Sequence, residues 1–145
     1  MLFRSDFASV IERVERAIAC GAHGELLGRL RLRQAEAHRW QGDFVASEQR
    51  GLEALRMLET GSDPWLMGVG EMASVFGNLG SVDGVVDLGG AMLQVCRELP
   101  PPGSDGVLSA LSRTSTSALL LSKVDLAEAL HGELERLAEI GRAHV

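Results

Sequence analysis

The chain is poor in aromatic residues: its 145 residues include no tyrosine, four phenylalanines and two tryptophans. Small β-sandwiches and barrels rely on aromatic and β-branched side chains, so this shortage argues against an all-β fold. The many leucine, alanine, glutamate and arginine residues favour helices instead. Hydrophobic residues make up 46% and charged residues 23% of the chain, which is typical of a folded domain and not of a disordered segment.

Cysteines and long apolar runs are also scarce. Cys20 and Cys96 lie far apart within apolar helical patterns, which indicates two buried free thiols in a reducing compartment. The longest apolar runs, such as residues 118–121, fall far short of the roughly 20 residues that a membrane-spanning helix needs. No signal peptide precedes the first amphipathic segment. We therefore expect a cytoplasmic protein that does not associate with membranes.

Basic residues are outnumbered by acidic ones. The chain has 14 lysines and arginines against 20 aspartates and glutamates, a net charge of -6 and a pI of about 5.2. Proteins that bind nucleic acids normally carry a basic face. The local cluster of Arg29, Arg31 and Arg33 is closely followed by acidic residues. We expect no nucleic-acid partner.

Apolar residues recur at helical spacing throughout the chain, and no segment alternates with the period of two that a strand requires. The clearest pattern is formed by Trp65, Val69, Met72 and Phe76. The predicted helices span about residues 6–21, 25–41, 44–59, 85–99 and 106–121. A further helix is predicted to start at residue 64 and to end between residues 77 and 84, and the last is predicted to start at residue 124. Asp63 is expected to cap the fourth helix. The sequence therefore predicts an all-α fold.

Six of these helices pair into hairpins at regular intervals. The turns begin at Gly42, Gly80 and Ser122, which are separated by 38 and then 42 residues. Near-constant spacing of one helical unit is the mark of a repeat array, in which neighbouring units stack to bury their apolar faces jointly. We predict a leading helix in residues 1–24. The three hairpins are predicted in residues 25–62, 63–103 and 104–139.

Aligning the three turns places similar residues in columns. A small residue lies seven positions before each turn, and an apolar residue lies two positions after it. These residues are Ala35, Ala73 and Ser115, and Phe44, Val82 and Val124. The column set, most clearly residues 40–48, resembles the tetratricopeptide repeat (TPR) family over residues 25–139. His38, Phe76 and Ala118 stand where that family has tyrosine, and the units exceed its 34 residues.

The resemblance implies a right-handed α-α superhelix, a TPR-like solenoid with a groove lined mainly by the first helix of each hairpin. Long, irregular repeats of this kind look like the helical segments of large bacterial signalling proteins, which neighbour kinase, ATPase or cyclase domains. Residues 140–145 resemble a translated DNA-sequencing adapter. We expect this tail to be artefactual and the natural chain to continue beyond Glu139.

The sequence contains few residue patterns that indicate catalysis or metal binding. Its four histidines are His23, His38, His131 and His144. No two of them have the i, i+4 spacing of a helical metal pair, and neither cysteine belongs to a CxxC motif. The loose G-x-G-x-x-A pattern of residues 68–73 lies inside a predicted helix and not after a strand, so it indicates close helix packing and not dinucleotide binding. We expect no catalytic residue, cofactor or metal.

The leading functional hypothesis is a non-catalytic protein–protein interaction or scaffold segment of a larger bacterial regulatory protein. Its partner is a peptide or protein, which can be another domain of the same chain, and the sequence does not indicate an oligomeric state. The exposed groove candidates are Arg33, His38, Glu71, Asn78, Arg113 and Thr116. The alternatives are an all-α small-molecule sensor or enzyme with a pocket between helices, and a spacer between catalytic modules.

Overall fold

The computed structural model describes the backbone of residues 2–138 and the side chains of residues 6–138. The tail of residues 140–145 lies outside the described residues. The helices are α1 (Leu2–Ala19), α2 (Gly24–Trp40), α3 (Phe44–Met57), α4 (Asp63–Leu79), α5 (Val82–Arg97), α6 (Asp105–Leu120) and α7 (Val124–Ala138). No strand occurs between residues 2 and 138, which confirms the predicted all-α fold class.

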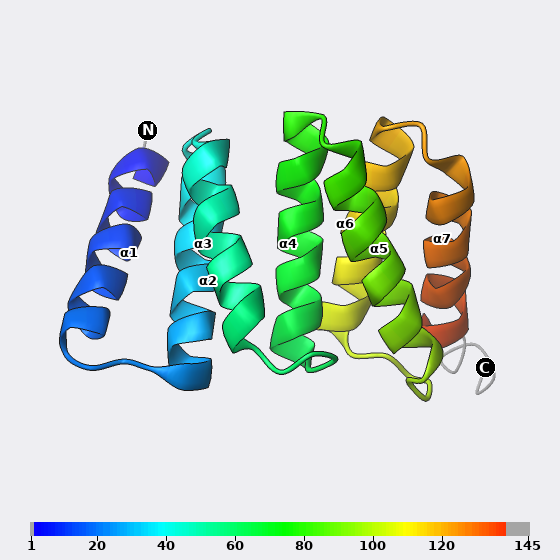
Figure 1. Cartoon of the computed structure of the whole chain (residues 1–145), viewed down its shortest axis with the longest axis horizontal. Helices are drawn as coiled ribbons and strands as arrows, with labels where there is room; N and C mark the ends of the chain where they lie inside the picture. The colour runs from blue at the N-terminus through cyan, green and yellow to red at the C-terminus, as the bar shows by residue number, and fades with distance from the viewer. Residues whose placement is uncertain (1, 139–145) are drawn as a thin grey trace.

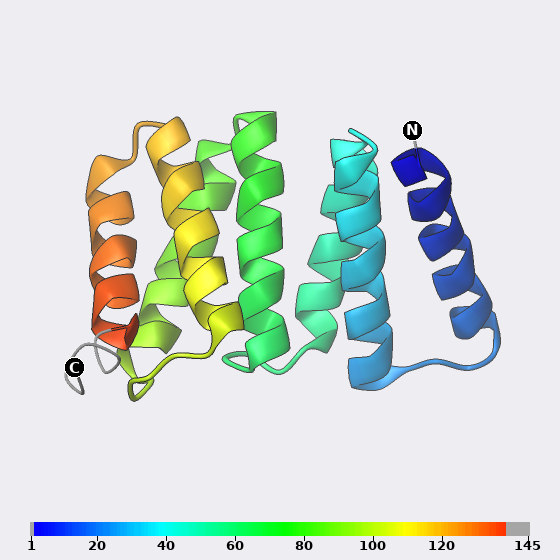
Figure 2. The ribbon, with the colours of Figure 1, turned by 180° about the vertical axis from the view of Figure 1, so that it is seen from behind.

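The helices run roughly parallel to one another from α1 at one end of the molecule to α7 at the other, with α3 in front of α2 and α5 in front of α6 (Figure 1). Consecutive helices α2 and α3, α4 and α5, and α6 and α7 pack against each other, and α4 also packs against α6. Figure 2 shows α2 and α6 in front of α3 and α5. The helices α2, α4 and α6 therefore share one side of the molecule.

The three turns at Gly42, Gly80 and Ser122 have the same backbone geometry. Their φ angles are +80°, +70° and +60°, in the left-handed region that glycine adopts at little cost and serine does not. The next residue in each turn donates its N–H to a carbonyl five positions earlier, with distances of 2.8–2.9 Å. This is the Schellman motif, which ends a helix and satisfies its last carbonyl groups. The acceptor carbonyls belong to His38, Phe76 and Ala118.

Three helix starts differ from their predicted positions. The helix α5 begins at Val82, three residues before the predicted start, because the Ser81 hydroxyl caps it by accepting a hydrogen bond from the Gly84 N–H. The cap of α4 is Ser62, whose hydroxyl accepts a hydrogen bond from the Trp65 N–H, and Asp63 is already the first helical residue. Ser62 has the extended backbone that a capping residue needs, so the prediction for Asp63 was wrong. The helix α1 begins at Leu2, whereas the sequence predicts a start after Ser5 or Asp6. Ser5 and Asp6 do not mark the helix start, because the residues before them can also adopt a helical conformation.

The small residues before the turns lie inside the hairpins. Ala35 and Ala73 are fully buried, and Ser115 is nearly so. In the first hairpin, the Ser47 hydroxyl donates to the Ala35 carbonyl at 2.7 Å. In the third hairpin the direction is reversed, and the Ser115 hydroxyl donates to the Ala127 carbonyl at 3.1 Å. Ser47 and Ala127 form a further column, five residues after the start of each turn, and this column faces that of Ala35 and Ser115 in both hairpins.

The core is centred on α4. Leu66, Val69, Met72, Ala73 and Val75 of this helix are all fully buried. Among the described side chains of α1, by contrast, Val14 alone is a buried hydrophobic residue. Apolar packing therefore holds α3 to α7 together, and α1 depends more on the polar contacts described below.

Candidate functional site

A pocket of about 380 Å³ opens on the side shared by α2, α4 and α6. Its lining residues are Arg29, Leu30, Leu32, Arg33, Glu36, Pro64, Met67, Glu71, Gly106, Ser109, Ala110 and Arg113. All three helices are first helices of the predicted hairpins. The pocket therefore lies on the side where the sequence predicts a groove.

The position of the pocket follows from unequal helix spacing. The helix α6 packs closely on α4, because Gly70 leaves room for Ala110: a Cβ atom at Gly70 would lie 2.9 Å from the Ala110 Cα. Gly77 leaves similar room for Ser117, whose Cβ and Oγ would lie within 3.3 Å. The helix α2 approaches α4 much less extensively. The pocket occupies this wider side of α4.

Glu71 is the polar centre of the site. Its side chain is only 6% exposed, and it forms ion pairs with Arg39 of α2 and Arg113 of α6. The Arg113 Nη2 atom lies 2.8 Å from Glu71 Oε2, and the Arg39 Nε atom donates to Oε1. A buried carboxylate needs such partners to compensate for lost hydration. One acid of α4 thus connects both neighbouring helices.

Two further arginines lie at the rim. Arg29 and Arg33 are one helical turn apart on α2, so their side chains lie on the same face. Their side chains are 57% and 68% exposed. Among the described side chains, each forms an ion pair with a carboxylate of its own helix, Glu25 at 2.8 Å and Glu36 at 3.1 Å. Exposed pairs of this kind contribute little to stability, so these guanidinium groups remain open to other anions.

The remaining lining is mainly apolar. Leu30 and Leu32 come from α2, Pro64 and Met67 from the first two turns of α4, and Ala110 from α6. Met67 is 46% exposed, so part of its apolar surface is accessible at the pocket. An apolar surface next to exposed guanidinium groups can bind a ligand that has both an apolar and an anionic part.

Three of the six predicted groove residues line this pocket: Arg33, Glu71 and Arg113. Glu71 is buried and not exposed as predicted, because both of its oxygens are enclosed by arginines. Asn78 and Thr116 are outside the lining set; each binds a carbonyl of its own helix, Asn78 Nδ2 at 2.8 Å and Thr116 Oγ1 at 2.9 Å.

His38 is also outside the lining set. It is half-buried, and its buried Nδ1 atom has no hydrogen-bond partner among the described residues. Burial lowers the pKa of His38, the Asp43 carboxylate raises it, and the Arg50 guanidinium lowers it. Arg50 and Asp43 place this imidazole near α3 and the first turn, and not in the pocket.

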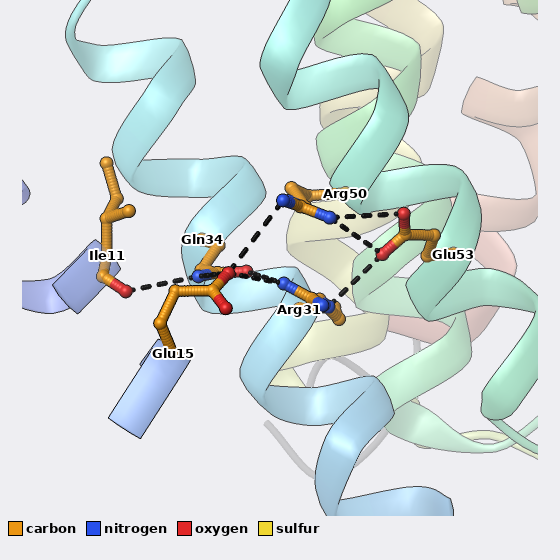
Figure 3. Close-up of polar contacts among 6 residues, drawn as sticks. All are labelled: Ile11, Glu15, Arg31, Gln34, Arg50 and Glu53. Atoms are coloured by element: carbon orange, nitrogen blue, oxygen red, sulfur yellow. Dashed lines mark hydrogen bonds and ion pairs between the residues drawn. The ribbon is translucent and has the colours of Figure 1, made fainter. Parts of the chain in front are cut away.

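A second polar cluster joins α1 to α2 and α3 (Figure 3). The fully buried Gln34 donates to the Ile11 carbonyl at 3.1 Å and to Glu15 Oε1 at 3.0 Å, and it accepts from Arg31 at 2.7 Å. Arg31 also pairs with Glu15 at 2.8 Å and with Glu53 at 3.1 Å. Hydrogen bonds from Gln34 and then Arg31 lower the pKa of Glu15. These groups bind one another, which indicates a structural role in attaching α1.

Sequence reasoning missed Arg29, Arg39 and Met67. Arg29 could have been found from its i, i+4 spacing to Arg33. Met67 lies on a strongly apolar helix, where each large side chain is normally assigned to the core. Arg39 is 32 residues from Glu71, and no local pattern gives the register between their helices.

Within residues 2–138, no group of three histidine, cysteine, aspartate or glutamate side chains could hold a metal ion. None of the helices in this range is long and apolar enough to cross a membrane. Comparisons of the chain with protein-family models, curated proteins and solved structures found no match.

Proposed function

We propose that this chain is a non-catalytic, peptide-binding segment of stacked TPR-like hairpins, which serves as an interaction scaffold in a larger bacterial regulatory protein of the cytoplasm. The observation that carries the proposal is the pocket on the common side of α2, α4 and α6. It combines a partly exposed apolar surface with accessible guanidinium groups. Arginines and large apolar side chains are frequent anchors at protein interfaces.

Two repeated features support the solenoid arrangement. The turns at Gly42, Gly80 and Ser122 have equivalent φ angles and equivalent hydrogen bonds. The hydroxyl-to-carbonyl contacts of Ser47 with Ala35 and of Ser115 with Ala127 join the same two columns in different hairpins. Units that repeat at this level of detail are expected to stack in a regular manner, as in helical repeat proteins.

The polar groups of the pocket support binding and not catalysis. Glu71 is its buried acid, and both carboxylate oxygens are engaged by arginines. A general base needs an oxygen within hydrogen-bond reach of the proton that it abstracts. These pairs suit a site that positions charge for recognition.

The test is selection of a random peptide library on the immobilised protein, with Met67→Arg as the pocket variant. Met57→Arg is a matched control, because Met57 is similarly exposed at 39%, belongs to α3 and is absent from the pocket lining. We expect peptides that bind the parent chain and the Met57 variant but not the Met67 variant. Circular dichroism checks that all three are folded. If no peptide distinguishes the two variants, the assignment of this pocket is wrong.

A small-molecule sensor is the second candidate, and the pocket volume favours it. About 380 Å³ lies within the range of about 300–1,000 Å³ that is typical of small-molecule sites. A metabolite present at 100 times its Kd would stabilise the fold by ~2.7 kcal/mol. A thermal-shift screen detects such a gain. A large shift for one compound, lost in Met67→Arg, would favour a sensor over a peptide-binding scaffold.

A further inference from the structure

Building on the proposed peptide-binding function, we propose that the pocket recognises an acidic peptide in which an aliphatic side chain lies next to aspartate or glutamate. The aliphatic side chain occupies the surface around Met67 and Pro64. The neighbouring carboxylates bind Arg29 and Arg33. The proposal rests on the different roles of the arginines in the site.

The two inner arginines, Arg39 and Arg113, already bind a carboxylate of the chain itself. Arg39 and Arg113 have side chains that are 18% and 33% exposed, and both bind the buried Glu71. Removing either from Glu71 would leave a buried charge poorly compensated, so these arginines stay with that carboxylate. They shape the pocket and connect its helices.

The two outer arginines, Arg29 and Arg33, can exchange their present carboxylate partners for those of a ligand. Arg29 and Arg33 are more than half exposed, and their partners Glu25 and Glu36 are 64% and 40% exposed carboxylates of the same helix. A carboxylate of the ligand can form the same ion pairs with Arg29 and Arg33 as Glu25 and Glu36 do. The aliphatic side chain next to that carboxylate also buries apolar surface, which adds binding free energy that an exposed ion pair alone does not provide. The planar guanidinium group also binds a carboxylate through two parallel hydrogen bonds.

The net charge of the pocket lining favours a ligand that is negatively charged. Its lining contains three arginines and two glutamates, whereas the whole chain carries a net charge of -6. The pocket is thus a locally positive site on an acidic protein, which attracts acidic segments and disfavours basic ones. The apolar lining from Leu30, Pro64 and Met67 distinguishes the expected ligand from a purely polar anion.

The experiment uses three fluorescein-labelled peptide pools, acetylated and amidated so that carboxylates come only from side chains. The first pool fixes Glu-Leu-Glu within random flanks, the second fixes Lys-Leu-Lys, and the third fixes Glu-Ser-Glu. Fluorescence anisotropy with the full chain measures binding. We expect the first pool to bind about tenfold or more tightly than the other two, and its affinity to fall with added NaCl.

Three variants locate the binding. Arg29→Ala and Arg33→Ala should each weaken binding of the first pool about tenfold. Arg16→Ala is the matched control, because Arg16 is 76% exposed and pairs with Glu12 of its own helix at i, i+4, as Arg29 does with Glu25. It should leave affinity unchanged. Glu25→Gln should strengthen binding, because it removes the competing carboxylate, and a merely structural role for Arg29 would not produce that gain.

The outcomes separate this inference from the proposed function. Equal binding of the first two pools, or equal losses in the Arg16 and Arg29 variants, overturns the preference for acidic peptides. If that binding still depends on Met67, peptide recognition itself stands. Equal binding of the first and third pools overturns the aliphatic requirement. If no pool binds, and library selection also yields no peptide dependent on Met67, both proposals fail.

Discussion

Replacing Gly70 with alanine perturbs the close contact of α4 with α6, which defines one side of the pocket. The new methyl group would lie 2.9 Å from the Ala110 Cα, 3.1 Å from its Cβ and 3.3 Å from its carbonyl oxygen. Two of these atoms belong to the backbone and cannot rotate away. The two helices must therefore separate by several tenths of an ångström, and α6 carries Arg113 with it.

The expected magnitude combines two opposing terms. Alanine inside a helix is favoured over glycine by about 1 kcal/mol, because glycine loses more backbone entropy on folding. Overpacking a tight contact costs about 1–3 kcal/mol. Gly90 isolates the first term: it lies in α5, is exposed, and has no atom within 4 Å of an added Cβ. Gly70→Ala should therefore be less stable than Gly90→Ala by about 1–3 kcal/mol.

Thermal and urea unfolding followed by circular dichroism measure this difference. For a chain of this size, 1 kcal/mol corresponds to about 2–4 °C in Tm, so a difference of about 1–3 kcal/mol should separate the two variants by roughly 2–12 °C. Gly90→Ala is expected to lie above the parent chain. If Gly70→Ala is stabilised as much as Gly90→Ala, then α4 and α6 are not in close contact at this position. The account of why the pocket lies beside α2 would then be wrong.

Three further predictions concern single ionisable groups. Glu71→Gln leaves two arginines without their shared carboxylate and should destabilise the fold by about 1–3 kcal/mol in urea unfolding; an unchanged midpoint would show that these ion pairs do not form. Because burial lowers the pKa of His38, the unfolded chain binds protons more readily, and stability should fall as the pH drops below about 6.5. Replacing His38 with Gln should reduce that slope between pH 7.5 and 5, and an unchanged slope would contradict the effect of burial on His38. Of the two cysteines that were predicted to be buried, Cys96 is buried and Cys20 is exposed, so the prediction for Cys20 was wrong. Burial raises the pKa of Cys96 to about 11, so a thiol reagent at pH 8 should label Cys20 in the native chain and Cys96 only after denaturation; rapid native labelling of both would contradict the burial of Cys96.

Much of the fold can be predicted from local sequence, because local chemistry sets where helices start and stop. The starts of α3 at Phe44 and of α7 at Val124 follow directly from the turns before them. Gly42 and Gly80 adopt left-handed backbone angles that glycine tolerates, and glycine is the strongest sequence signal for such a turn. Ser122 gives a weaker signal, and its turn is predicted mainly from its distance to the others.

The candidate site depends on long-range register, which local patterns do not contain. Helical spacing shows that Arg33 and Glu71 belong to first helices of hairpins, but not how far α2 is shifted along α4. That shift decides that Arg39, and not Arg33, reaches Glu71. It also turns Glu71 from a predicted surface residue into a buried one. For the same reason, local patterns do not show that nearly half of the Met67 surface is exposed beside the pocket.

The helix α4 is held to its two neighbours on this side by different physical means, and the pocket results from the difference. Toward α6, Gly70 and Gly77 remove side-chain volume, so the backbones approach and dispersion contacts dominate. Toward α2, the space is wider and Arg39 reaches across it to Glu71. A polar bridge fixes the separation of two helices without filling the volume between them. The apolar surface beside that bridge therefore stays open to a ligand, while Arg29 and Arg33, whose partners Glu25 and Glu36 are exposed, can determine its charge.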